Sequence, residues 1–279
     1  MSNENAGILM SVYKPAVSTD DAKIADMWSI SGKLLHTDAY RRTFAKLLAQ
    51  ALGDRDQSIL DAACGTGFPM IELRDLGFKN LTGADADRDL LDEFRATIAA
   101  RQDRDKWNPE LKLARWQELP QRIDRQFDTV LNVDAAIGFM DSWLPGDMRQ
   151  GPVAIFARVI EVLRNFHAVT RPGGRFFIGL QKNNHKGNSY HPMFVGRMLV
   201  DGREALAHWN MSYDWQTRIK TWVNQVEWDG QRFEQMRQSY LFDLDELAGF
   251  LREAGFAAVT RLPTPDDLYE DILIATRAG

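Results

Sequence analysis

Short apolar runs alternate with amphipathic segments through the middle of the chain. The apolar runs predict strands near residues 58–62, 80–85, 110–114, 127–132 and 175–180. The segments between them carry apolar residues at helical spacing and predict helices near residues 67–76, 88–102 and 152–170. Apolar strands separated by helices are typical of a parallel sheet that is buried on both faces.

Residues 182–241 do not continue this alternation. Residues 218–226 alternate between apolar and polar side chains, and a turn at Asp229-Gly230 leads into a second strand near 233–242. These two strands predict a small antiparallel element inserted into the chain.

The two ends of the chain add helices and strands. Residues 20–52 have the pattern of two helical segments. Towards the other end, Asp243 and Glu246 have the spacing of a capping box at the start of a helix, and strands are expected near 256–262 and 269–276. We therefore expect an α/β fold with a Rossmann-like, mostly parallel seven-stranded sheet, helices on both faces, an N-terminal helical segment and a small antiparallel β insertion.

The same pattern divides the chain into four parts. These are an N-terminal helical segment, a Rossmann-like core, the antiparallel insertion and a C-terminal helix with strands that complete the core, at residues 1–57, 58–181, 182–241 and 242–279.

A glycine-rich turn follows the first predicted strand. The run from Ile59 to Gly67 places an acid, Asp61, at the end of the strand and Gly65 just ahead of the helix. Such a strand–turn–helix unit binds nucleotides, because glycine lets a ligand approach the backbone. A dinucleotide fits poorly, since Met70 stands where that motif has a third small residue and a pyrophosphate would face the acid. A cationic cofactor without phosphate, S-adenosylmethionine (SAM), fits better.

A second acid ends the next predicted strand. Asp85 follows the turn at the spacing, about 20 residues, at which an acid accepts hydrogen bonds from ribose hydroxyls. A glycine-rich turn alone also occurs in ordinary strand–helix connections. The joint pattern of Asp61, Gly65, Gly67 and Asp85 favours a SAM site.

Composition narrows the partners and the compartment. The chain has 279 residues and a net charge of −5, and no cluster of Lys and Arg resembles a nucleic-acid footprint. Cys64, the single cysteine, lies in the turn as a packing residue, so no disulfide forms within the chain and we expect a cytoplasmic protein. We expect no signal peptide and no membrane span, since no run approaches the ~18 apolar residues that a span needs.

The turn, the acid that follows it and the Arg-Pro-Gly-Gly run at 171–174 resemble a class I SAM-dependent methyltransferase. Within that class the chain is most similar to the glycine N-methyltransferase group. Met27-Trp28 and residues 37–40 match the group's N-terminal lid, residues 114–119 match its Ala-Asn-Trp segment, and residues 182–241 match its antiparallel substrate lid. The resemblance implies SAM as cofactor, S-adenosylhomocysteine (SAH) as product and methyl transfer by in-line displacement.

Carried over residue by residue, the resemblance also implies a set of cofactor contacts. It places the methionine end of SAM on the turn, the ribose on Asp85, and the adenine against Ala86, Arg115 and Trp116. The full implied set is Trp28, His36, Asp61, Ala63, Gly65, Gly67, Asp85, Ala86, Arg115, Trp116 and Val133.

The substrate positions depart from the glycine enzymes. Gln181 stands where those enzymes have an Arg that clamps the substrate carboxylate, and Ala135 replaces an Asn. Gln cannot reproduce a bidentate, charge-assisted contact. Either Lys182 supplies a weaker positive charge or the acceptor has no carboxylate, and glycine itself is not expected to be the acceptor. The implied substrate-binding residues are Tyr13, Ala135, Gln181, Tyr190 and Tyr240.

No catalytic base is assigned, because proximity and orientation carry most of the methyl transfer to a neutral amine. His185 and His191 are the candidate bases if the acceptor atom is oxygen or carbon. No metal is expected. We favour N-methylation of a small molecule; a small-molecule O-methyltransferase and a catalytically idle SAM-binding regulatory protein are the alternatives. A homo-oligomer is left open.

Overall fold

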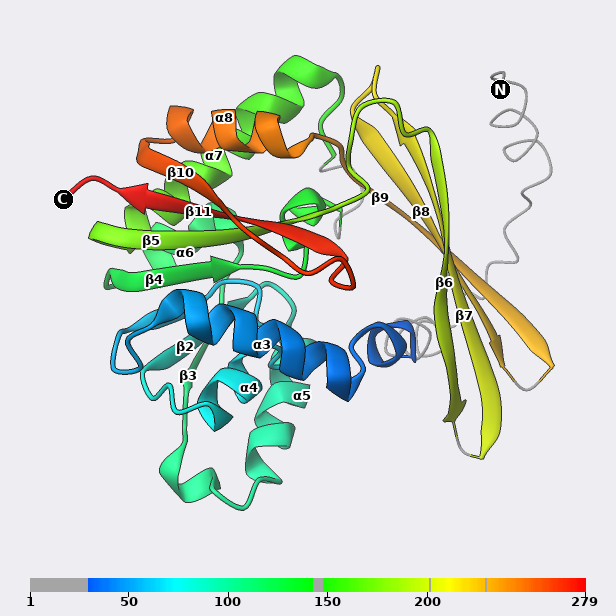
Figure 1. Ribbon diagram of the computed structural model, residues 1–279, viewed down its shortest axis with the longest axis horizontal. Coiled ribbons are helices and arrows are strands. Elements are labelled where there is room, and N and C mark those ends of the chain that lie inside the picture. The colour runs from blue at the N-terminus through cyan, green and yellow to red at the C-terminus, as the bar shows by residue number, and fades with distance from the viewer. Residues whose placement is uncertain (1–29, 143–147, 201, 229) are drawn as a thin grey trace. The chain divides into compact units, whose positions relative to one another are not determined.

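The computed structural model describes residues 30–142, 148–200, 202–228 and 230–279 (Figure 1). The chain forms two compact units. The parallel-sheet unit comprises residues 38–185 and 242–279. The antiparallel unit comprises the described residues of 30–37 and 186–241.

One seven-stranded sheet forms the parallel-sheet unit. Its strands are β1 (Ile59–Asp61), β2 (Leu81–Asp85), β3 (Glu110–Leu113), β4 (Phe127–Asn132), β5 (Thr170–Gln181), β10 (Phe256–Leu262) and β11 (Glu270–Arg277). They lie in the order β10-β11-β5-β4-β1-β2-β3. Strands β1 to β5 run parallel to one another, whereas β11 is antiparallel to β5 and β10 is antiparallel to β11. The predicted mostly parallel seven-stranded sheet is confirmed.

Helices cover both faces of this sheet (Figure 1). They are α3 (Asp38–Leu52), α4 (Met70–Asp75), α5 (Arg88–Ala99), α6 (Leu119–Arg122), α7 (Pro152–Val169) and α8 (Leu244–Glu253). Neighbouring side chains of a strand point to opposite faces. Phe177 of β5 packs in an apolar cluster with side chains of α3, α4 and α5, while Phe176 stacks on Phe166 of α7 with ring centroids 4.7 Å apart. No helix in the described part of the chain is long and apolar enough to cross a membrane.

Side-chain caps determine where two of the helices begin. Asp87 accepts hydrogen bonds from the backbone N–H groups of Asp89 and Leu90, which starts α5 directly after β2. Asp243 and Glu246 form the capping box that the sequence predicts at the start of α8. Each cap satisfies backbone N–H groups that have no partner within the helix.

Four antiparallel strands form the sheet of the second unit. They are β6 (Tyr190–Val200), β7 (Arg203–Asp214), β8 (Ile219–Trp228) and β9 (Gln231–Tyr240), in that order across the sheet. The expectation of only two strands was incomplete, because it included β8 and β9 but missed β6 and β7. Strand β6 contains Pro192 and a bulge at Gly196, both of which interrupt the alternation that marks a strand.

One face of the antiparallel sheet packs against residues 30–35, which are helical. Ile30 and Leu34 contact an apolar cluster of Ala205, Ala207 and Val226. Ser31 donates a hydrogen bond of 2.8 Å from Oγ to Oδ1 of Asn224 on the same face. The helical expectation is thus confirmed for residues 30–35 and 38–52, while residues 20–29 lie outside the described chain.

The opposite face carries a chain of polar side chains across all four strands. The Tyr190 hydroxyl donates to Asn210 Oδ1 (2.6 Å), Asn210 Nδ2 donates to Gln225 Oε1 (3.2 Å), and Gln225 Nε2 donates to Glu234 Oε1 (2.8 Å). Cross-strand pairs of this kind hold the register of neighbouring strands.

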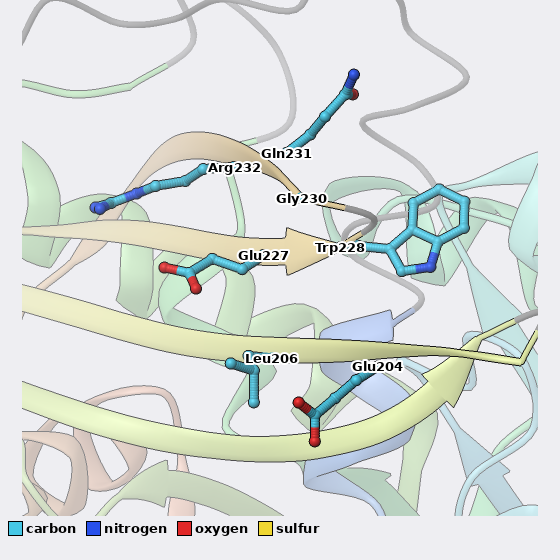
Figure 2. Close-up of a pocket in the computed structure, with 7 residues that line it drawn as sticks. All are labelled: Glu204, Leu206, Glu227, Trp228, Gly230, Gln231 and Arg232. Atoms are coloured by element: carbon cyan, nitrogen blue, oxygen red, sulfur yellow. The ribbon is translucent and has the colours of Figure 1, made fainter.

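An open depression of about 280 Å³ lies at the end of this sheet where β8 turns into β9 (Figure 2). It is lined by Glu204, Leu206, Glu227, Trp228, Gly230, Gln231 and Arg232. Two of its charged groups take part in surface ion pairs, Glu204 with Arg197 at 3.3 Å and Arg232 with Glu234 at 2.7 Å. Such pairs are ordinary on an exposed sheet. The depression contains none of the acids and glycines that the sequence marks for chemistry.

Candidate functional site

The turn between β1 and α4 lies at the carboxyl edge of the parallel sheet. The N–H of Cys64 donates to Ala84 O (3.2 Å), and the N–H of Gly67 donates to Cys64 O (2.7 Å). Gly65 and Gly67 have φ of 46° and 109°, a region that favours glycine. A Cβ on Gly67 would overlap the Phe94 ring, whereas a Cβ on Gly65 would meet nothing within 4 Å. Packing therefore requires glycine at 67, while Gly65 has open space beside its backbone.

Asp85 connects the end of β2 to this turn. Its Oδ2 accepts a hydrogen bond of 2.9 Å from the Gly65 N–H, and its Oδ1 accepts one of 2.9 Å from the Asp87 N–H. Burial raises the pKa of Asp85, and these two backbone donors oppose that rise. The acid thus shapes the turn itself, a role that the sequence did not reveal.

Asp61, the last residue of β1, is 1% exposed. Its Oδ1 accepts a hydrogen bond of 3.2 Å from the Ala63 N–H, and its Oδ2 has no hydrogen-bond partner among the residues that the structure describes. Burial, together with the nearby charges of Asp85 and Asp134, raises the pKa of Asp61 to about 8. A cation placed beside Oδ2 would reverse this shift.

The loop after β4 lies next to the same edge, because β4 pairs with β1. Val133 is buried, and Asp134 and Ala135 both have left-handed backbones, with φ of 63° and 52°. Asn132 is fully buried, and neither polar atom of its carboxamide has a partner within the described ranges. Val133 and Ala135 of this loop were predicted as site residues from the sequence, whereas Asn132 and Asp134 were not.

Glu270, at the start of β11, also belongs to this edge and was missed. Its side chain is fully buried, and its Oε1 and Oε2 accept hydrogen bonds from the N–H groups of Asp134 (3.1 Å) and Ala135 (3.0 Å). Burial raises the pKa of Glu270 well above its usual range, with Asp134 adding to the rise. No local signal marked it, since an acid at the start of a strand usually faces water.

Tyr40 lies in α3 of the parallel-sheet unit, whereas residues 37–40 resemble a lid segment in sequence. Its ring stacks on Tyr269 and Phe44, with centroids 5.5 and 6.0 Å apart. Burial raises the pKa of its hydroxyl, and the nearby Glu270 and Asp134 add to the rise. The side chain therefore packs into the sheet unit beside the acids of the carboxyl edge.

Trp116, proposed from the resemblance as an adenine contact, is attached to the loop after β1. Its Nε1–H donates to the carbonyl oxygen of Ala62, and its ring lies 5.9 Å from that of Phe166. Arg115 is partly buried, and Ala86 is exposed just beyond β2. The contacts of these residues with adenine stay a prediction.

Among the predicted substrate residues, Gln181 is 6% exposed at the end of β5, and Ala135 is 7% exposed. The ammonium group of the neighbouring Lys182 donates to the carbonyl oxygen of Pro265. His185 is exposed in the same unit. The roles of these residues toward a substrate are untested.

The other predicted residues belong to the antiparallel unit or lie outside the description. Tyr190, the first residue of β6, is 43% exposed, and Tyr240, the last residue of β9, is 1% exposed. His36 and His191 are partly buried in the same unit. Tyr13 and Trp28 lie outside the described residues. The structure therefore brings together Asp61, Ala63, Gly65, Gly67, Asp85, Val133 and Ala135 at one edge of the parallel sheet.

Within residues 30–279, leaving aside the undescribed gaps, no group of three or more His, Cys, Asp or Glu side chains has the geometry of a metal site. At the carboxyl edge, Asp85 accepts a hydrogen bond from the N–H of Gly65, whose backbone has open space beside it.

Known structures share this fold. An S-adenosylmethionine-dependent methyltransferase from Clostridium acetobutylicum ATCC 824 superposes with a TM-score of 0.65 at 13% identity, covering 92% of this chain and 99% of its own. CalS10, an amino pentose methyltransferase from Micromonospora echinaspora, gives 0.68 at 15% identity, covering 90% and 96%. DesVI from Streptomyces venezuelae gives 0.65 at 16% identity, covering 94% and 100%. At these identities the likeness shows the fold alone.

Sequence comparison identifies the family. Among curated proteins, none matches the chain at a significant level. The family model described as a methyltransferase domain matches residues 36–261, which include the turn, Asp85 and the loop after β4. The chain therefore belongs to the methyltransferase domain family.

Proposed function

We propose that the protein transfers a methyl group from SAM to the nitrogen of a small-molecule amine that carries no carboxylate. The observation that carries the proposal is the pairing of an open backbone position at Gly65 with the buried, unpartnered Oδ2 of Asp61. An unpartnered carboxylate oxygen in a buried place favours a positively charged ligand. SAM carries an ammonium and a sulfonium and has no phosphate.

The residues at the carboxyl edge fit this cofactor. Gly65 would admit its methionine end, Asp61 would face its positive charge, and Asp85 would accept bonds from the ribose. Bound SAM supplies a methyl group that is already activated, so the protein has to bind and orient the acceptor. A neutral amine attacks without a base, which agrees with the exposed position of His185.

Charge at this edge favours an amine acceptor. Asp134 follows β4, which pairs with β1 ending at Asp61, and its N–H donates to Glu270 at 3.1 Å, so the three acids share this edge. The ammonium of Lys182 is held by a backbone carbonyl, and Gln181 replaces the clamping Arg of the glycine enzymes. Buried acids with raised pKa values release protons when a cation binds, so this edge admits a basic amine more readily than a carboxylate or a nucleic acid. Membership of the glycine N-methyltransferase group, with a different acceptor, is part of this proposal, and the lid role of residues 182–241 stays a prediction.

The two glycines of the turn offer a matched pair of variants. Gly67→Ala is expected to lower the free energy of unfolding by about 3 kcal/mol or more, because its Cβ overlaps Phe94 at a backbone angle that alanine avoids. Gly65→Ala is expected to cost about 1–2 kcal/mol for the left-handed backbone alone. It should nevertheless weaken SAH binding at least about tenfold, because the new methyl group occupies the space left for the ligand.

Thermal unfolding and isothermal titration with SAH separate these two effects. A folded Gly65→Ala variant that binds SAH with wild-type affinity would show that no ligand approaches this backbone position. A loss of stability as large as that of Gly67→Ala would show that the space at Gly65 is not open.

The acceptor class is tested with matched pairs of small molecules and methyl-labelled SAM. Each pair compares an amine with its carboxylate counterpart, for example ethanolamine with glycine and phenethylamine with phenylalanine; phenols and alcohols form a third set. We expect labelled N-methyl products from the amines without carboxylate, identified by mass spectrometry and by the carbon shift of the new methyl group. Comparable turnover of glycine, an O-methyl product, or tight SAM binding with no transfer to any acceptor would each contradict the proposal.

A further inference from the structure

We propose that Glu270 is a positioning residue for methyl transfer, which holds the loop after β4 in place through the backbone N–H groups of Asp134 and Ala135. The inference rests on the proposed function, because that loop lies at the edge where SAM and the acceptor would meet. Glu270 itself would touch neither of them.

The backbone of this loop needs an anchor. Asp134 and Ala135 both have left-handed φ, 63° and 52°. Asparagine and aspartate tolerate this region, but an alanine Cβ is unfavourable there. Two successive backbone N–H groups in such a turn form a concave anion site. Here Glu270 fills that site from within the protein, with one carboxylate oxygen on each N–H, at 3.1 and 3.0 Å.

The route of the Glu270 side chain explains a glycine in the neighbouring strand. Strand β5 lies between β11 and β4, so the carboxylate has to cross β5 to reach the loop. It crosses at Gly179, where a Cβ would overlap the carboxylate and would also come within 3.3 Å of the Ala135 backbone nitrogen. The Glu270 side chain thus links the start of β11 to the loop after β4, and the lack of a side chain at Gly179 lets it pass β5.

The arrangement matters for chemistry because small displacements in a methyl-transfer site are costly. Proximity and orientation supply most of the rate when the cofactor brings its own activation. The loop carries Val133 and Ala135, which are predicted to lie beneath the cofactor and at the acceptor. Releasing the carboxylate would let this loop move relative to β1 and its turn.

The test compares Glu270→Gln and Gly179→Ala with the wild type. Gln keeps the shape of the side chain but turns an N–H toward one of the two backbone donors, and the methyl group added by Gly179→Ala pushes the carboxylate away. Both variants are expected to lower kcat/KM for the amine acceptor at least about tenfold and to raise Kd for SAH and KM for SAM by a smaller factor, because Ala135 is bonded to Glu270 directly and Val133 is not. Because both remove the same anchor, the double variant should be no more than about threefold worse than the poorer single variant.

Thr129→Val is the matched control. Thr129 is also fully buried in β4, and it donates a hydrogen bond of 2.6 Å to Gln57, which precedes β1 and is not part of the loop. It should lower Tm and leave kcat/KM unchanged. Hydrogen exchange of peptides over residues 133–140 should become faster in Glu270→Gln and Gly179→Ala and stay slow in Thr129→Val.

A second variant keeps the test useful if Glu270→Gln does not fold. Ala135→Gly removes the cost of the left-handed backbone, so Glu270→Gln/Ala135→Gly should fold, and its kcat/KM should fall at least about tenfold below that of Ala135→Gly alone. Folded variants with kcat/KM and loop exchange like the wild type would overturn the inference. Failure of the wild type to transfer methyl groups would instead overturn the proposed function.

Discussion

Replacing Asp85 with alanine is expected to weaken SAM binding about 30- to 150-fold, which corresponds to about 2–3 kcal/mol for hydrogen bonds to a charged group. The carboxylate is predicted to accept the ribose hydroxyls, and it already accepts the N–H groups of Gly65 and Asp87. Its loss therefore removes a ligand contact and loosens the turn at the same time. Isothermal titration of the folded variant with SAM and SAH measures the effect.

Asp87→Ala provides the control for Asp85→Ala. Asp87 is exposed, lies two residues away and caps α5. Its loss should lower the free energy of unfolding by about 1 kcal/mol and leave SAM affinity within about threefold. If Asp85→Ala folds and binds SAM as tightly as the wild type, Asp85 is not a cofactor ligand.

The affinity for SAM is expected to rise with pH between 6 and 8, by up to about tenfold per pH unit. Burial raises the pKa of Asp61 to about 8, so the free protein holds a proton on this carboxyl at neutral pH. A bound cation favours the ionised form and lowers the pKa, so binding releases the proton. Below pH 8 the release of this proton costs free energy. The cost falls as the pH rises, so SAM binds more tightly at higher pH.

Asp61→Asn should remove this dependence, because the amide has no proton to release. SAM affinity is measured for both proteins from pH 6 to 8. The ionisation of the amino group of SAM affects both measurements equally, so it drops out of the difference between them. An unchanged slope in Asp61→Asn would show that another group is linked to binding.

The same shift predicts a trend in the stability of the free protein. The pKa of Asp61 is raised from 3.8 to about 8, so its contribution to stability is fully present below pH 3.8 and is lost as the pH rises towards 8. Chemical unfolding across this range should show a steeper fall with pH in the wild type than in Asp61→Asn, where the raised pKa values of Asp85 and Glu270 still contribute. Parallel curves would contradict the shift.

The parts of the fold that follow from local sequence were predicted well. Strands β1, β2, β4 and β5, the turn at Gly65 and Gly67, and the capping box at Asp243 all depend on residues that lie close together in the chain. In contrast, β6 and β7 were missed. A proline and a bulge interrupt β6, and an antiparallel strand is stabilised by partners that its own sequence does not reveal.

The Arg-Pro-Gly-Gly run shows how a local signal can be right and still incomplete. The sequence predicts a helix near residues 152–170 and the fifth strand near 175–180, with this run between them, and Gly173 has a φ of 74°. Pairing with β4 nevertheless begins before the run, at Thr170, and resumes after it, at Arg175. The residues between form an excursion within β5, because the neighbouring strand pairs on both sides of them.

The sequence by itself determined the class of fold, the strand–turn–helix unit and the two acids, Asp61 and Asp85, at its edge. These depend on residue type and spacing within about one strand and one helix, and there the backbone has few conformations to choose from. Only the tertiary structure decided which other groups share that edge. Glu270 meets Asp134 and Ala135 because the sheet order places β11 beside β5, and Gly179 leaves room for its side chain. More than a hundred residues of chain separate these partners, so neither segment alone indicates that a buried carboxylate and two left-handed residues satisfy each other.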